Sequence, residues 1–161
     1  MTVVSNTGPL VGLAKVDQLH LLEQLFGEVH IPPAVHRELL AKTGPEAPRL
    51  DDALARFIKT NQMPQFPPMV TIVTQRLGPG EQEAVALAYE LKAPLVIDDR
   101  QGRAAARRLG MAIMGVAGVL IRAKEASLIP AVRPLLDDVR QRGYWLSDEL
   151  INVAAKLAGE S

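Results

Sequence analysis

Polar side chains follow two apolar segments that have the composition of short buried strands. Residues 3–5 (VVS) lead into Asn6, and residues 94–97 (PLVI) lead into Asp98 and Asp99. In an open parallel sheet, ligands bind beyond the carboxyl ends of the strands. Because one N-cap needs only one carboxylate, capping alone does not explain two adjacent aspartates. We therefore expect at least one of the pair to be functional.

Two glutamates near predicted helix starts complete a set of four acidic positions that we expect to converge. Glu38 lies in the segment that begins at Pro32 and Pro33, and Glu81 directly follows Gly80. Clustered carboxylates repel one another and stay ionised only when a cation balances them. Hard oxygen ligands suit Mg²⁺ or Mn²⁺. Such an ion can activate water and offset charge on a phosphodiester, so the pattern predicts metal-assisted phosphodiester hydrolysis.

Each of these residues also has an explanation that needs no catalysis. The helix macrodipole alone favours Glu81 at a helix N-terminus, and Asn6 could simply cap the first helix. Glu38 could pair with Arg37 or Lys42 on an exposed helix face. No dinucleotide-binding, P-loop or H-E-x-x-H motif occurs. We expect surface or structural roles for the three histidines, His20, His30 and His36.

Charge is unevenly distributed along a chain whose net charge is zero. Residues 100–142 contain nine basic residues and three acidic ones, a local balance of +6 that leaves −6 for the remainder. Within this region Arg100, Arg103 and Arg107 share one helix face that begins next to Asp99. The face could hold phosphates or be an ordinary solvated surface, and the regional charge favours a polyanionic partner.

The elements that would position these residues alternate between strands and helices. Strands are predicted at 3–5, 29–31, 70–74, 94–97 and 112–114. Helices are predicted after residue 6 and at about 17–27, 32–39, 49–59, 81–92, 101–109, 116–126, 130–142 and 147–158. This alternation predicts a parallel sheet that helices cover on both faces. The proline-rich segment 60–69 is expected to be a surface loop.

Length and composition restrict the class of protein. The 161 residues suit one domain, expected to consist of a core of about 1–126 and a helical extension of about 127–161. The aromatic content of 4% argues against base-stacking platforms, and the absence of cysteine excludes disulfides and thiolate ligands. No apolar run approaches the length of a membrane span, so we expect a cytoplasmic protein without a membrane partner.

Four stretches resemble, in order, the motifs of PIN-domain proteins, a family of small metal-dependent ribonucleases that includes the VapC-like toxins. The stretches are VVSNTGPL, IPPAVHREL, GPGEQEAVALAYELKAPLVIDDR and the tail LSDEL. At the family's acidic positions they carry Asn6, Glu38, Glu81 and Asp99, the last directly before Arg100. The likeness is greatest to a less characterised prokaryotic branch with the patterns VSNTSPL, IPPAV, GEAEA and IDDRRGR.

The resemblance implies a fold, a reaction and partners. The fold would be a PIN-like three-layer α/β/α sandwich with a central parallel sheet of four to five strands and C-terminal helices. The reaction would be endoribonucleolytic cleavage of RNA with Mg²⁺ or Mn²⁺. A small antitoxin protein would be the partner if the chain is the toxin of a toxin–antitoxin pair.

The resemblance also implies roles for the site residues. The metal ligands would be Asn6, Glu38, Glu81 and Asp99. The catalytic residues would be Glu38, Glu81, Asp99 and Asp98, the last assisting its neighbour. Thr7 would support a ligand without binding the ion. The RNA would be held by Arg100, Arg103 and Arg107.

Two positions depart from the family pattern and keep a second hypothesis open. Asn6 stands where most PIN nucleases carry aspartate, and Gly8 stands where a hydroxyl residue is usual. An amide ligates more weakly than a carboxylate, so the alternative is a catalytically weak or inactive module that binds RNA or a protein partner. A phosphate-binding receiver or a small-molecule hydrolase is a third class.

The C-terminal segment carries an apolar stripe at helical spacing. The stripe consists of Leu146, Leu150, Val153 and Leu157. Such a stripe must be buried against the body of the protein or against a second copy of the chain, which makes a dimer the expected assembly.

Overall fold

The computed structural model describes residues 1–161 and contains one five-stranded β-sheet. The strand order is β3-β2-β1-β4-β5, and every neighbouring pair is parallel. The strands are β1 (Val3–Ser5), β2 (Val29–Ile31), β3 (Ile58–Thr60), β4 (Leu95–Val96) and β5 (Ile113–Met114). The predicted central parallel sheet is therefore confirmed.

The strand order creates a topological switch point between β1 and β4. The chain proceeds outward from β1 through β2 and β3, then returns to the opposite side of β1. Val4 and Leu95 pair across this junction and are fully buried, as expected for central strands covered on both faces. Ligands bind outside the carboxyl ends of strands at such a point. The polar residues that follow β1 and β4 therefore begin next to each other.

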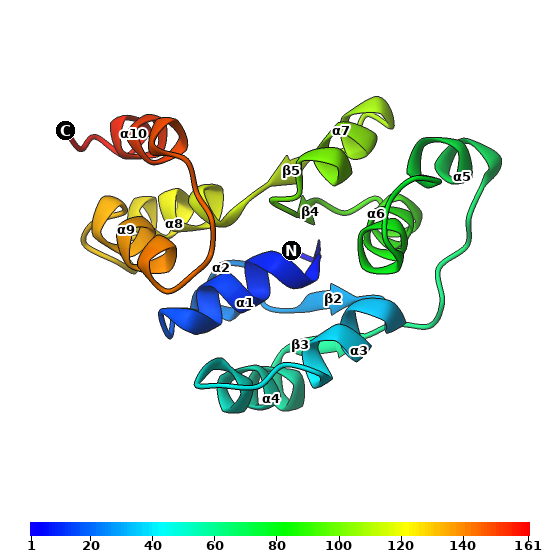
Figure 1. Ribbon diagram of the computed structural model, residues 1–161, viewed down its shortest axis with the longest axis horizontal. Helices are drawn as coiled ribbons and strands as arrows, with labels where there is room; N and C mark the ends of the chain where they lie inside the picture. The colour runs from blue at the N-terminus through cyan, green and yellow to red at the C-terminus, as the bar shows by residue number, and fades with distance from the viewer.

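Ten helices surround the sheet in the expected α/β/α arrangement. Figure 1 shows α5, α6 and α7 at one end of the molecule and α8, α9 and α10 together at the other. None of the helices has the length and apolarity to cross a membrane. The helices are α1 (Thr7–Lys15), α2 (His20–Phe26), α3 (Pro33–Leu40), α4 (Glu46–Arg56), α5 (Pro68–Thr74), α6 (Pro79–Leu91), α7 (Arg100–Arg108), α8 (Val116–Glu125), α9 (Arg133–Gln141) and α10 (Asp148–Leu157).

One predicted strand is wrong. Residues 70–74 form most of α5, and the third strand of the sheet is β3, which the sequence predicts as the end of a helix and the first residue of a loop. The predicted loop 60–69 is shorter, because Thr60 ends β3 and α5 begins at Pro68. Pro68 is well placed in the first turn of α5. Val70 and Thr74, four residues apart, are buried while Ile72 is 57% exposed, which is a helical period. Tertiary burial therefore overrides the strand propensity of this β-branched segment.

A continuous hydrophobic cluster joins the sheet to the C-terminal helices. It extends from Val3 in β1 to Ala154 in α10 and includes Leu146, which is 3% exposed. The first residue of the predicted apolar stripe is thus buried against the body of the protein. The division into a core of about 1–126 and an extension of about 127–161 stays a prediction.

Candidate functional site

The side chain of Asn6 lies at the junction of β1 and α1, next to the switch point. Asn6 is 4% exposed and occupies the N-cap position of α1, but its side chain makes no capping hydrogen bond. Its Oδ1 atom is buried without a hydrogen-bond partner. A buried acceptor left unpaired costs about 1–3 kcal/mol, so it calls for an explanation. Helix capping does not supply one here.

Thr7 and Gly80 together determine where the Glu38 carboxylate lies. Thr7, the first residue of α1, donates its hydroxyl to Glu38 Oε1 at 2.8 Å. The same carboxylate lies so close to Gly80 in α6 that a Cβ atom there would overlap both of its oxygens. A glycine at this position therefore allows α3 and α6 to approach. Their approach brings Glu38 toward Glu81, the next residue of α6.

The surroundings of Glu81 show that the three predicted acidic ligands form one electrostatic cluster, which together with Asn6 is called the acidic cleft. Burial raises the pKa of Glu81, and the negative charges of Asp99 and Glu38 raise it further. Hydrogen bonds from its own backbone and from the Asn6 amide act in the opposite direction. Residues from four separate segments of the chain are thus close enough to interact electrostatically. The cleft contains negative charge that no protein cation balances in this set.

Asp99 combines this electrostatic contact with a local structural role. It is the N-cap of α7, where its Oδ2 accepts a hydrogen bond from the Gly102 N–H at 2.7 Å. The residue is exposed to solvent. One carboxylate oxygen is occupied by the cap, which leaves the other free to face a ligand.

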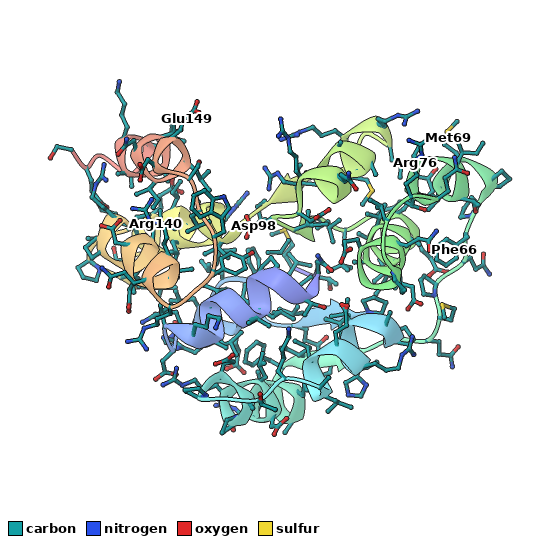
Figure 2. All side chains as sticks on the ribbon, viewed as in Figure 1. Phe66, Met69, Arg76, Asp98, Arg140 and Glu149 are labelled. Carbon is teal, nitrogen blue, oxygen red and sulfur yellow. The ribbon has the colours of Figure 1, made fainter.

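Asp98 is directed away from Glu81 and binds another part of the molecule. Its Oδ2 accepts hydrogen bonds from the Tyr144 hydroxyl at 2.6 Å and from the Val116 N–H at 3.2 Å. Figure 2 shows Asp98 near the centre of the molecule, close to the start of α8. The residue lines a groove of about 620 Å³ between α8 and α10 rather than joining the electrostatic cluster around Glu81. The two adjacent aspartates therefore have different surroundings.

Two residues that support the site were not singled out by the sequence patterns. Glu83 is 7% exposed, and its Oε1 accepts a hydrogen bond from the Ala34 N–H at 2.9 Å, at the start of α3. A signal for it exists, since Glu83 lies two residues after Glu81 in an otherwise apolar part of α6. Tyr144 is the second, and nothing near it in the sequence indicates its contact with Asp98.

The predicted phosphate-binding arginines differ in exposure. Arg100 and Arg107 are exposed on α7. Arg103 turns inward, and its Nη1 donates to the carbonyl oxygen of Ile97 at 2.8 Å. The three therefore do not present three equivalent guanidinium groups to solvent, and Arg103 supports the turn that carries the two aspartates.

Two observations bear on whether these residues suit a divalent cation. The unpaired Asn6 oxygen and the mutually repelling carboxylates of Glu81, Asp99 and Glu38 are the donor set and the charge that a hard cation satisfies. As the side chains stand, no group of three or more His, Cys, Asp or Glu residues is arranged to hold a metal ion. The types of donor atom therefore suit a divalent cation, but the carboxylates are not close enough together to coordinate one ion as they stand.

Fold and site together define a small α/β protein with an acidic cleft at the switch point of a parallel sheet. The family model described as PIN domain (DUF3368) matches residues 2–160, so the chain belongs to the PIN-domain family. The resemblance inferred from the sequence motifs is thereby confirmed. No curated protein matches the chain.

Two of the solved structures that match the chain show the shared fold. A PilT N-terminus domain protein from the hyperthermophilic archaeon Sulfolobus solfataricus is 22% identical, covers 76% of this chain and 93% of its own, and gives a TM-score of 0.55. The crystal structure of VapBC2 from Rickettsia felis, bound to a DNA fragment from their promoter, is 15% identical, with 71% and 98% covered and a TM-score of 0.50. At these identities the likeness concerns the fold.

Proposed function

We propose that this PIN-domain protein is a metal-dependent endoribonuclease that hydrolyses phosphodiester bonds in RNA. The observation that carries the proposal is the electrostatic cluster at the switch point. Burial, the charge of Asp99 and the charge of Glu38 all raise the pKa of Glu81, while a buried Asn6 oxygen lies unpaired beside it. An uncompensated acidic cleft is costly unless it binds a cation, so its presence favours a metal-binding function over a purely structural one.

Each residue of the cleft has a proposed task. Glu38, Glu81 and Asp99 would bind Mg²⁺ or Mn²⁺ through carboxylate oxygens, and Asn6 would contribute its unpaired Oδ1. When bound, such an ion lowers the pKa of a water ligand and offsets charge on the phosphodiester. Thr7 holds the orientation of Glu38 through their hydrogen bond. Asp98 is proposed to assist from outside the cleft by fixing the turn that carries Asp99.

The RNA is proposed to follow the exposed face of α7. Arg100 and Arg107 are exposed there, beginning directly after Asp99. Their guanidinium groups would contact phosphates on either side of the scissile bond. Arg103 contributes positive charge to the same region while its Nη1 holds the Ile97 carbonyl.

The test combines RNA cleavage with direct metal binding. The purified chain is incubated with single-stranded and structured RNA in Mn²⁺ or in EDTA, and Mn²⁺ binding is measured by calorimetry. We expect cleavage in Mn²⁺ only, a loss of at least about 100-fold in Glu81→Gln and in Asp99→Asn, and weaker Mn²⁺ binding in both.

Glu90→Gln is the matched control for Glu81→Gln. Glu90 lies on the same helix but is exposed outside the cluster, so the control should cleave like the wild-type chain. Cleavage that persists in EDTA, or that survives in an Asp99→Asn and Glu81→Gln double variant, would contradict the proposal.

A non-catalytic module that binds RNA or a protein is the second candidate. It is favoured by the neutral Asn6 and by the absence of three carboxylates in ligating arrangement. Asn6→Asp distinguishes the two candidates. If residue 6 faces the ion, the added charge should tighten Mn²⁺ binding and increase cleavage. If the cleft binds no ion, the variant should instead be destabilised by a fourth repelling carboxylate.

The proposed partner is a small antitoxin protein, with this chain as the toxin of the pair. The sequence motifs resemble those of VapC-like toxins, and VapBC2 shares the fold. Co-expression with the product of the neighbouring gene, followed by purification through a tag on that product, tests the pairing. Recovery of both chains in a constant ratio is expected, and recovery of the tagged product alone would count against an antitoxin at that locus.

A further inference from the structure

Tyr144 reaches from the segment between α9 and α10 into a slot on the surface of α1. The slot exists because Gly8 and Gly12, one helical turn apart, have no side chains. A Cβ atom at Gly12 would lie 3.2 to 3.3 Å from three atoms of the tyrosine ring. A Cβ atom at Gly8 would lie 3.2 Å from the tyrosine hydroxyl. The phenol thus occupies the space that side chains at these two positions would fill.

The hydroxyl of Tyr144 makes one hydrogen bond, to Asp98. It donates to Asp98 Oδ2 at 2.6 Å, and the same oxygen accepts the Val116 N–H. Burial of the phenol and the adjacent Asp98 charge raise the pKa of Tyr144, so the group stays a protonated donor. Asp98 is therefore held on the side of the turn opposite the acidic cleft.

The consequence of this contact concerns Asp99. Side chains of neighbouring residues in an extended segment point to opposite sides. When Asp98 is held toward Tyr144, Asp99 is therefore directed toward Glu81. Arg103 reinforces the turn through its hydrogen bond to the Ile97 carbonyl. Next to the same hydroxyl lies Gly8, which directly follows Thr7, the residue that donates to Glu38. One side chain from the C-terminal segment therefore touches both segments that carry the cleft.

We infer that Tyr144 is a positioning residue for the cleft. Its ring occupies the slot at Gly8 and Gly12, and its hydroxyl holds Asp98 so that Asp99 faces the other proposed metal ligands. The inference rests on the proposed function, because its effect is on the metal site. It assigns the segment between α9 and α10 a role beyond packing, since Tyr144 in this segment orients an acidic ligand.

The experiment first removes the Tyr144 hydroxyl and then supplies a hydroxyl from position 8. Tyr144→Phe keeps the ring in the slot and removes only the donor to Asp98. Loss of such a supporting hydrogen bond should weaken Mn²⁺ binding, measured by calorimetry, by about 10-fold and lower kcat by a similar factor with little change in KM. Tyr89→Phe, the same change at the other tyrosine of the chain, should alter neither quantity.

Gly8→Ser supplies a hydroxyl from the opposite side of the contact. Alone it crowds the Tyr144 hydroxyl and should lower the unfolding temperature. In Tyr144→Phe the nearest ring atom to the new Cβ is 3.6 Å away, so the serine is accommodated. The double variant should therefore unfold at a higher temperature than Gly8→Ser and recover part of the Mn²⁺ affinity that Tyr144→Phe lost.

The outcomes separate this inference from the proposed nuclease activity. Wild-type protein that binds Mn²⁺ without cutting RNA would overturn the nuclease, while weaker binding in Tyr144→Phe would still support the positioning role. Tyr144→Phe that binds Mn²⁺ and cuts RNA like the wild type would overturn the positioning role alone. A wild-type chain that binds no Mn²⁺ would overturn both.

Discussion

The surroundings of Glu81 disfavour its ionised form. Burial and the charges of Asp99 and Glu38 raise the pKa of Glu81, and hydrogen bonds from its own backbone and from Asn6 oppose them. Asn6 adds a buried oxygen without a donor. Such arrangements reduce stability and are typical of functional sites, where a ligand supplies the missing partner. The stability of the protein should therefore report on the state of the cleft.

The pH dependence of stability in EDTA tests the environment of Glu81. Because its pKa is raised in the folded state, the folded chain binds a proton more tightly than the unfolded one. Stability is therefore lost as pH rises from the unfolded pKa of 4.5 through the raised folded value. Glu81→Gln removes this loss, so its unfolding temperature should exceed that of the wild type at pH 7 and match it below pH 4.

Addition of Mn²⁺ should reverse the order at pH 7, since the ion stabilises the wild-type chain and not the variant. Glu90→Gln, exposed on the same helix, should follow the wild type at every pH. A difference between Glu81→Gln and wild type that does not change with pH would show that the carboxylate is not held under repulsion.

Helices position the cleft by direct contacts between their ends and faces. The buried Glu83 of α6 accepts the Ala34 N–H, one of the backbone donors that the first turn of α3 leaves unpaired. The contact fixes the position of α3, which carries Glu38, relative to α6, which carries Glu81. Gly80 determines how closely the two helices approach. A carboxylate that is not itself in the cleft thus controls the distance between two that are.

Glu83→Ala should destabilise the protein by about 1–3 kcal/mol, because the Ala34 N–H is left buried without an acceptor. Urea unfolding measures the change. Glu83→Gln keeps an acceptor oxygen and should recover most of the loss, whereas Glu90→Ala on the exposed side of α6 should cost little. Equal stability of Glu83→Ala and Glu90→Ala would refute the capping role.

The sequence predicts those elements whose burial follows a simple pattern. β1 and β4 are short, mainly apolar segments whose residues are all buried, so both the strands and the polar residues after them are predictable. β3 is not, because only Ile58 of its three residues is buried and Lys59 and Thr60 are exposed. A strand with one buried residue carries no period that distinguishes it from a helix end.

The site is predictable to the same extent. Strand ends indicate that Asn6 and one of the two aspartates lie at the switch point. They do not indicate which aspartate faces Glu81, because that depends on Tyr144, which is 46 residues from Asp98 along the chain. Long-range contacts of this kind leave no local pattern. The family resemblance implies a supporting role for Thr7, but only the structure identifies Glu38 as its partner.

Glu160 connects the C-terminal end of the chain to two other elements of the molecule. Its carboxylate accepts hydrogen bonds from the Lys124 ammonium at 2.8 Å, the Val132 N–H at 2.7 Å and the Arg133 N–H at 2.9 Å. These bonds, the one from Lys124 first, lower the pKa of Glu160 to about 2. The end of the chain is thereby tied to α8 and to the start of α9.

The face of α10 that borders the groove between α8 and α10 carries the remainder of the apolar stripe. Leu150, Val153 and Leu157 are 36%, 51% and 71% exposed, so the body of the protein does not bury them. The first turn of α10 contains Asp148 and Glu149, and its last turn contains Lys156; Figure 2 shows Glu149 on the outer side of the helix.

A second copy of the chain is the occupant that this charge pattern fits. In a symmetric antiparallel pairing of α10 with itself, the acidic first turn of one helix meets Lys156 of the other while Val153 lies near the centre. We therefore expect a concentration-dependent dimer in sedimentation velocity, weakened at least about 10-fold by Val153→Glu, because a buried unpaired charge is costly. Ile72→Glu, at a similarly exposed apolar residue of α5, is the control.

Glu149→Lys should weaken the dimer by placing like charges opposite each other, and adding Lys156→Glu should restore it by exchanging the two signs. This restoration separates a symmetric α10 pairing from any other apolar association, which a charge exchange would not repair. A wild-type chain that remains monomeric at every concentration would contradict the dimer. Equal dimerisation of Val153→Glu and Ile72→Glu would place the contact elsewhere, since the α10 face is then not part of it.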